Sequence, residues 1–94
     1  MRLNSDSNLR SLVNVYLNGQ KEPYTVEVYV PGNALEGRGY VVRMVTKNGK
    51  AVATREVEKP LPPGLYDADG ALVEKVFGQV RIEITDEPTR FEDN

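Results

Sequence analysis

The sequence predicts a small all-β protein, built from hairpins as an antiparallel β-sandwich or partly open barrel of about six strands. Apolar and polar residues alternate in several short runs, which is typical of strands with one buried face. Turn dipeptides such as Asn48-Gly49 separate these runs at short intervals. Helical patterns are minor or absent.

The chain of 94 residues is long enough for one domain with a thin core. Residues 1–8 are polar and lack periodicity, so we expect an N-terminal arm that is mobile on its own. Residues 9–86 carry all the strand patterns and should form a single β domain. Residues 87–94 make an acidic C-terminal tail that should be disordered unless it docks.

The first two strands are expected at Leu9–Leu17 and Tyr24–Val30, because alternate positions in each are apolar. Asn18-Gly19 provides a turn signal between them, and Gln20–Pro23 extends the loop. Pro31-Gly32-Asn33 ends the second strand. Each strand should therefore present one apolar face to the core.

The central stretch, Gly39–Val57, is expected to organise the sheet as a hairpin around Asn48-Gly49. Both residues of that dipeptide tolerate positive φ, so the turn can be tight. A two-residue turn pairs Val45 with Val52, whereas a bulge at Gly49 shifts the pairing by one, and the sequence leaves both registers open. The first arm is apolar on both sides, so it is either central in the sheet or covered by another element such as a partner chain.

Two segments around this hairpin are expected to be irregular. Gly37-Arg38-Gly39 resembles part of a glycine-rich phosphate loop, but it opens no helix, and we interpret it as an ordinary loop that leads into the hairpin. Lys59–Gly64 contains prolines that exclude helix and interior strand. It is expected to be a stiff connector, and binding to an aromatic groove of another protein is the weaker alternative.

The last third of the chain should contain another hairpin and the final strand. Asp69-Gly70 gives a turn signal, and residues 71–77 fit either a strand or a short helical face. We favour the strand because turn residues bracket it closely. Gly78 is expected to break this run before a final strand over residues 79–85.

The composition excludes most catalytic and metal chemistry. The chain has no Cys and no His, so thiolate nucleophiles, thiolate metal sites and the commonest general base are missing. Asp67, Asp69 and Glu74 resemble a fragment of a calcium loop, but the spacing of the full loop is absent and an Asp-Gly turn explains them. We therefore expect no enzyme activity, no cofactor and no bound metal.

The N-terminal sequence MRLNSDSNLR contains no apolar core of a signal peptide, and no run approaches the roughly 20 apolar residues that span a bilayer. These observations predict a soluble chain that is not secreted by a signal peptide and does not enter a membrane. The net charge of -2 argues against indiscriminate binding to nucleic acid.

The charges are uneven along the chain, because basic residues dominate residues 38–59 and acidic residues dominate from Pro60 onward. This asymmetry suggests that the basic hairpin of one subunit meets the acidic last third of the next, in a head-to-tail contact. Surface ion pairs contribute little, so apolar side chains of the hairpin would have to carry the affinity. The candidate interface residues are Tyr40, Val41, Arg43, Met44, Val45 and Arg55.

Two other interpretations of the basic hairpin remain open. Its cations, together with Tyr40, fit a stacking and phosphate surface like that of an OB-fold. The same residues also fit the exposed face and lysine-guarded tip of an ordinary hairpin. The first interpretation predicts a small OB-like or Ig-like binding module for nucleic acid, glycan or protein. The cations concerned are Arg43, Lys47, Lys50 and Arg55.

Three runs resemble small β-rich structural proteins of tailed bacteriophage virions: YLNGQ at Tyr16–Gln20, GYVVRMVTKNGKAV at Gly39–Val52, and DADGALVEKVFGQVRIEI at Asp67–Ile84. The shared pattern is an Asn-Gly near the end of the first strand, a Gly-Tyr-Val entry to a hairpin, and a glycine before a final V-x-I-x-I strand. It covers most of residues 12–85, and the proline-rich connector is not part of it.

This resemblance implies a non-enzymatic structural or assembly role in a phage head, neck or tail. The partners it implies are copies of the chain itself and other structural proteins of the particle. On this basis we expect a homo-oligomer, located in a virion or in the cytoplasm of a bacterial host.

Overall fold

A computed structural model describes residues 1–4 and 13–84, and this part of the chain is all-β, as predicted. One 3-10 turn, η2 (Thr54–Glu56), is the helical element among the described residues. The predicted C-terminal tail, residues 9–12 of the first predicted strand and residues 5–8 of the predicted arm lie outside them. The strands are β1 (Arg2–Asn4), β2 (Val13–Leu17), β3 (Gln20–Lys21), β4 (Thr25–Tyr29), β5 (Glu36–Met44), β6 (Thr46–Lys47), β7 (Lys50–Ala51), β8 (Leu65–Ala68) and β9 (Ala71–Ile84).

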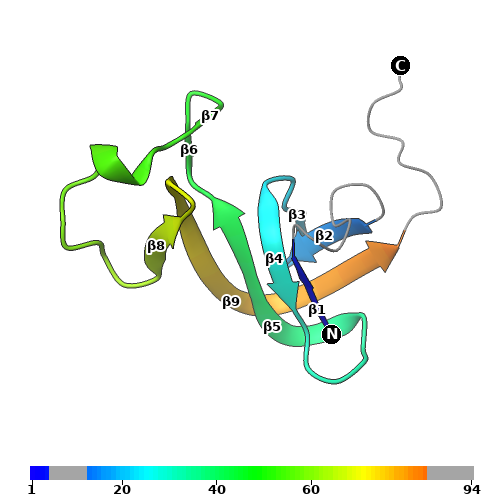
Figure 1. The fold of residues 1–94 in the computed structure, drawn as a ribbon. Coiled ribbons are helices and arrows are strands. Elements are labelled where there is room, and N and C mark those ends of the chain that lie inside the picture. Colours follow the sequence, from blue (N-terminus) through cyan, green and yellow to red (C-terminus); the bar gives the residue numbers. More distant parts are fainter. Residues whose placement is uncertain (5–12, 85–94) are drawn as a thin grey trace, which may run out of the picture.

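One open, antiparallel, seven-stranded sheet runs in the order β1-β4-β5-β9-β2-β3, with β8 beside β9 (Figure 1). The long strand β9 is its centre: β5 pairs along one edge, while β8 and β2 pair with the two ends of the other edge. The sheet does not close into a barrel. The β6–β7 hairpin forms a separate two-stranded sheet that projects beyond the main one in Figure 1.

The Gly39–Val57 stretch is therefore not the organising hairpin that the sequence suggested. Its first arm is the central strand β5, which pairs with β4 and β9 rather than with the residues after the turn. An arm that is apolar on both sides is accommodated there because strands pair along both of its edges and Val41 and Val42, on opposite faces, are both buried. Only the short segment Thr46–Ala51 forms the hairpin.

The register of this hairpin is the two-residue one. Asn48 and Gly49 both have positive φ, 54° and 79°, as a tight turn of this kind requires. The amide of Val52 donates to the carbonyl oxygen of Val45 at 3.0 Å, so these two residues pair and no bulge shifts them.

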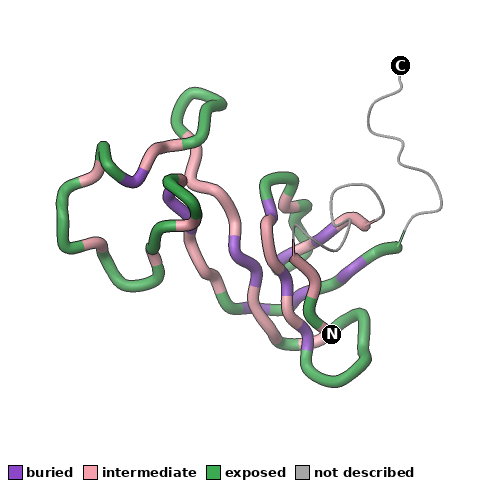
Figure 2. The backbone as a smooth tube through the Cα atoms, in the orientation of Figure 1, coloured by how far each residue is buried: buried purple, intermediate pink, exposed green. Residues whose placement is uncertain are grey.

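The main hydrophobic cluster lies on one face of the curled sheet, which we call the inner face, and it consists largely of valine. Figure 2 shows where buried residues lie along the strands. The strands that contribute to this cluster include β2 and β4, which lie toward opposite ends of the strand order. The sheet therefore curls, and its inner face closes over itself in the manner of a sandwich. Val28, Val41 and Val80 are fully buried there. The buried cluster comprises Val15, Leu17, Val28, Val30, Val41, Val80 and Ile82.

Gly37, Arg38 and Gly39 lie inside β5, so the predicted loop at this position is wrong. A Cβ on Gly39 would lie 1.8 Å from the backbone oxygen of Tyr29. The neighbouring strand can approach this closely only where a side chain is missing, which explains glycine within a strand.

Gly78 does not break the last strand either, since β9 is continuous through it. The space that its side chain would take is filled by Asn18, whose Oδ1 would lie 2.8 Å from a Cβ at this position. Asn18 itself has φ 51° and forms the predicted turn with Gly19, and its Oδ1 accepts a hydrogen bond from the amide of Gln79 at 3.0 Å. The favoured strand over residues 71–77 is confirmed.

The first residues of the predicted mobile arm are a strand, because β4 offers them a free edge. Arg2–Asn4 pair with β4, and the amide of Val30 donates to the carbonyl oxygen of Met1 at 2.8 Å. The terminal amino group of Met1 donates to the carbonyl oxygens of Val30 and Gly32. Lys59–Gly64 contains no strand, in keeping with the connector that was predicted.

Candidate interaction surface

Three aromatic side chains lie next to one another on the outer face of the sheet, opposite the core. The register places Tyr29 of β4 beside Tyr40 of β5, and Tyr40 beside Phe77 of β9. Val28 and Val41, the neighbours of the two tyrosines in sequence, point inward, so the alternation of each strand turns the aromatic rings outward. We call Tyr29, Tyr40 and Phe77 the aromatic patch.

The rings of the patch pack on one another and leave Phe77 outermost. The Tyr29 and Tyr40 ring centroids are 5.4 Å apart in a stacked arrangement, and Phe77 meets Tyr40 edge-on at 5.6 Å. Phe77 is 69% exposed, the largest fraction among the large hydrophobic residues of the described part. A phenyl ring this exposed in the middle of a sheet face is apolar surface whose contact with water is unfavourable.

Polar contacts hold the central ring, Tyr40, in place. Its hydroxyl donates to Glu27 Oε2 at 2.7 Å, and the Nε of Arg2 donates to the same oxygen at 3.2 Å. The Nζ of Lys75 lies 4.4 Å from the centroid of the Tyr40 ring, a cation–π contact. The patch is therefore a built arrangement of strands β1, β4, β5 and β9.

The protonation of this group follows from the same contacts. Burial would raise the pKa of Glu27, but the hydrogen bonds from Tyr40 and Arg2 and the charge of Arg2 outweigh it and lower the pKa below its ordinary value. The hydrogen bond to Glu27, aided by burial, raises the pKa of Tyr40. Glu27 is thus held as an accepting carboxylate and Tyr40 as a donating hydroxyl.

The backbone at Phe77 is also open at the sheet edge. On the edge of β9 away from β5, Lys75 donates its amide to Gly64, and Gln79 exchanges hydrogen bonds with Asn18. Phe77 lies midway, so the alternation of an antiparallel ladder turns its N–H and C=O to this edge too. Along β9, the pairing with β8 ends at Glu74 and the pairing with β2 starts at Val80. No described strand therefore pairs with residues 75–79 on this edge. We call this gap the notch.

A shallow hollow of about 310 Å³ lies beside the patch. Its lining adds Arg38, Gly39 and Gly78 to the three aromatic residues. Arg38 is exposed, and its side chain makes no ion pair or hydrogen bond with any residue in the described ranges. A partner that covers Phe77 would therefore also meet a cation without a counter-charge.

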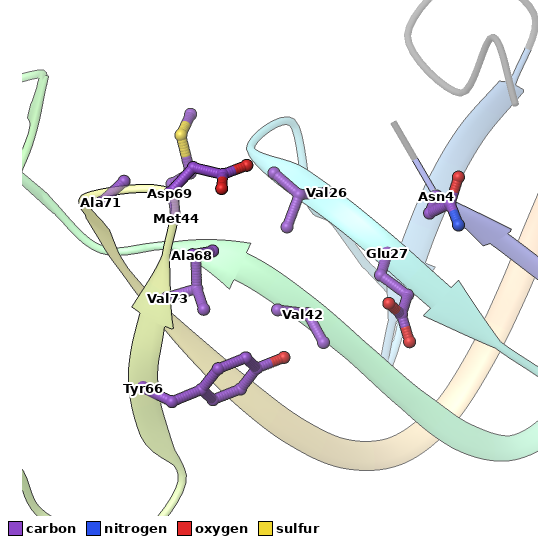
Figure 3. Close-up of a pocket in the computed structure, with 10 residues that line it drawn as sticks. All are labelled: Asn4, Val26, Glu27, Val42, Met44, Tyr66, Ala68, Asp69, Ala71 and Val73. Atoms are coloured by element: carbon purple, nitrogen blue, oxygen red, sulfur yellow. The ribbon is translucent and has the colours of Figure 1, made fainter. Parts of the chain in front are cut away.

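A second hollow of about 350 Å³, which we call the outer pocket, lies at the other end of the same face (Figure 3). Val42 and Val73, 2% and 1% exposed, form its floor. Figure 3 shows Asp69 on one side of this floor and Glu27 on the other, with the Tyr66 ring below. The full lining is Asn4, Val26, Glu27, Val42, Met44, Tyr66, Ala68, Asp69, Ala71 and Val73.

Of the residues predicted for the interface, Tyr40 belongs to the aromatic patch and Met44 to the outer pocket. Val41 is 0% exposed in the core, so it cannot contact a partner in this fold. Val45 is half-buried after the end of β5. Arg55 is exposed on η2, outside both hollows.

Arg43 is already paired within the chain. Its guanidinium lies 2.8 Å from Glu22 and 3.3 Å from Glu74, on the opposite face of β5 from Tyr40. Burial would lower its pKa, but the two carboxylates outweigh this and raise it. The structure therefore does not bring Arg43 and Tyr40 together into the stacking and phosphate surface that the OB-like interpretation needs.

Sequence reasoning missed Tyr29, Phe77 and Asp69 as surface features, although a signal for two of them was present. The valines of the second strand predicted that Tyr29 points away from the core. Had Gly78 been read as part of one long strand, the inward positions of Val80 and Ile82 would have placed Phe77 outward as well.

Within residues 1–4 and 13–84, no group of three or more acidic side chains is placed to hold a metal ion. No helix in these ranges has the length and apolar character needed to cross a bilayer. Comparisons with protein-family models, with curated proteins and with solved structures found no match to this chain.

Proposed function

We propose that this chain is a non-enzymatic structural or assembly subunit, which works through repeated contacts between copies of itself made by the outer face. The observation that carries the proposal is Phe77, which is 69% exposed at the end of an ordered aromatic patch. Aromatic residues are enriched at the centres of protein interfaces, where they exclude water and contribute most of the affinity.

A protein partner fits this surface better than a nucleic acid does. Tyr40 has Tyr29 on one side and Phe77 and Lys75 on the other, so its ring is already engaged within the chain. The hydroxyl of Tyr40 donates a hydrogen bond to the carboxylate of Glu27, and the negative charge of this carboxylate would repel a phosphate backbone. A protein surface needs only to cover Phe77 and to satisfy the backbone groups at the notch.

The resemblance of the sequence to small β-rich virion proteins suggests where such contacts would be used. In a tailed phage or phage-like particle, one small subunit repeats around a head, neck or tail, and each copy meets neighbours through the same surface. On this proposal the chain acts in the virion and, before assembly, in the cytoplasm of the bacterial host.

Sedimentation velocity of the purified chain over a range of concentrations tests the proposal. The wild-type chain should form species larger than the monomer, and Phe77→Ser should shift the distribution toward the monomer. Ile84→Ser is the matched control, because Ile84 is 60% exposed on the same strand but on its opposite side. A wild-type chain that stays monomeric at every concentration would overturn the proposal, as would equal effects of the two substitutions.

A further inference from the structure

We infer that the outer pocket receives the tip of the β6–β7 hairpin of a second copy, with a lysine ammonium of that tip placed against Asp69. This inference rests on the proposed self-association and names the contact that propagates it. Every subunit carries both the hairpin and the pocket, so each copy can insert its hairpin into one neighbour and receive the hairpin of another, in a head-to-tail contact.

The pocket suits a long amphipathic cation. Its floor is Val42 and Val73, and its walls include the apolar side chains of Val26 and Met44 (Figure 3). At about 350 Å³ it is near the small end of the range for ligand pockets. The methylene stem of a lysine can lie along such a floor while its ammonium stays at the polar rim.

The rim of the pocket carries a carboxylate, that of Asp69, which has no bonding partner in the described part of the chain. Asp69 lies at the tip of the β8–β9 hairpin with φ 53°, and its side chain makes no hydrogen bond or ion pair with any described residue. Glu27, across the pocket, is already shared between Arg2 and Tyr40. Asp69 is therefore the acidic group at this rim that is available to a partner.

The hairpin supplies the matching cations. Lys47 and Lys50 face each other directly across the Asn48-Gly49 turn, an arrangement of like charges that destabilises an isolated hairpin. Both lysines are exposed, and neither side chain forms an ion pair or hydrogen bond with a described residue. Neither lysine lines the outer pocket, so the hairpin does not fill the pocket of its own subunit. A neighbour's carboxylate would relieve this repulsion.

The position of the hairpin fits this role. It is a two-stranded sheet outside the main sheet, and it projects away from the body (Figure 1). A two-stranded hairpin is marginally stable alone. Docking against the apolar floor of a neighbouring pocket would bury its tip and order it.

A charge exchange between two variants tests this contact. Lys47→Glu/Lys50→Glu has an acidic tip that its own acidic pocket repels, and Asp69→Lys has a basic pocket that its own basic tip repels. By sedimentation velocity, each variant alone should have a dissociation constant for self-association at least about tenfold higher than that of the wild type. The equimolar mixture should associate again, because each tip then has a pocket of opposite charge.

The matched control is Lys21→Glu/Lys59→Glu, which makes the same change of charge at two exposed lysines outside the pocket and the hairpin. This control should associate like the wild type. If the wild type associates but the mixture does not recover, or if the control behaves like the hairpin variant, the hairpin-to-pocket contact is overturned while self-association stands. If the wild type never associates, the contact and the proposed function fall together.

Discussion

The inner and outer faces of the sheet use the same strands for opposite purposes. On β5, Val41 points inward and is 0% exposed, while its neighbour Tyr40 points outward into the aromatic patch. On β9, Val80 is fully buried, while Phe77 is 69% exposed. The inner face holds the fold through close packing of valines, and the outer face holds an ordered apolar surface that one copy of the chain leaves uncovered.

On the proposed self-association, this comparison predicts that the stability of the fold and the association of its copies can be changed separately. The cluster on the inner face is buried within one copy of the chain. The outer face is held in shape by local contacts, such as the hydrogen bond from Tyr40 to Glu27, each of which contributes less to global stability than the buried valines do. Substitutions on the inner face should therefore unfold the chain, and those on the outer face should separate its copies.

The largest effect is expected from Gly39→Ala. Its new Cβ would overlap the backbone oxygen of Tyr29 at 1.8 Å, which only a movement of β4 or β5 could relieve. We expect the free energy of unfolding, measured by urea denaturation, to fall by about 3 kcal/mol or more.

Gly37→Ala is the control for this substitution, because a Cβ there would meet only the Val30 side chain, at 3.3 Å. It should cost clearly less than Gly39→Ala. Equal losses of stability in the two variants would show that the close approach of the two strands is not the reason for glycine at position 39.

Val41→Ala and Phe77→Ala compare the two faces directly. Removal of two buried methyl groups at Val41 should lower the free energy of unfolding by roughly 2 kcal/mol. Phe77→Ala should lower it by less than about 1 kcal/mol, because most of the ring is already in water. Denaturation of both variants at a concentration where the chain is monomeric checks this, and a reversed order would contradict the assignment of the core.

Tyr40→Phe removes the hydroxyl that Glu27 accepts and leaves the ring packing unchanged. We expect a loss of about 1 kcal/mol in the free energy of unfolding. Tyr24→Phe serves as control, because Tyr24 is exposed and its hydroxyl has no described partner. Similar losses for the two tyrosines would mean that the bond to Glu27 contributes nothing.

The smallest effect is the pH dependence of Glu27. Because the folded pKa of this carboxyl is lowered, its contribution to stability is fully present above the unfolded pKa and is lost as the pH falls through the folded pKa. The difference in stability between the wild type and Glu27→Gln should therefore shrink from neutral pH to about pH 3. Unfolding titrations across this range check the sign, and a difference that grows toward acid would contradict it.

Local chemistry made part of this fold predictable. Asn18-Gly19, Asn48-Gly49 and Asp69-Gly70 each form a turn in which both residues have positive φ, as the dipeptides alone indicated. The alternation of valines identified strand β4, with Val28 and Val30 turned inward. It was wrong for Val26, because a bulge between Thr25 and Glu27 shifts the register and Val26 lines the outer pocket instead.

What sequence could not supply was contact between distant segments. Gly39 and Gly78 resemble strand breakers, and only the positions of Tyr29 and Asn18 show why a side chain is excluded there. Arg43 seemed free for a partner, whereas Glu22 and Glu74, 21 and 31 residues away, already pair with it. The outer pocket likewise exists only because β4, β5 and the β8–β9 hairpin meet.

Amide hydrogen exchange at Phe77, followed by NMR at low and at high protein concentration, tests the role of the outer face most directly. In the monomer the N–H of Phe77 faces the notch, so it should exchange quickly, while the amide of Val41, which lies in the β5–β9 ladder, exchanges slowly. On association the exchange of Phe77 should slow markedly and that of Val41 should not change. An unchanged rate at Phe77 in samples that contain larger species would contradict a contact that covers Phe77 and the notch.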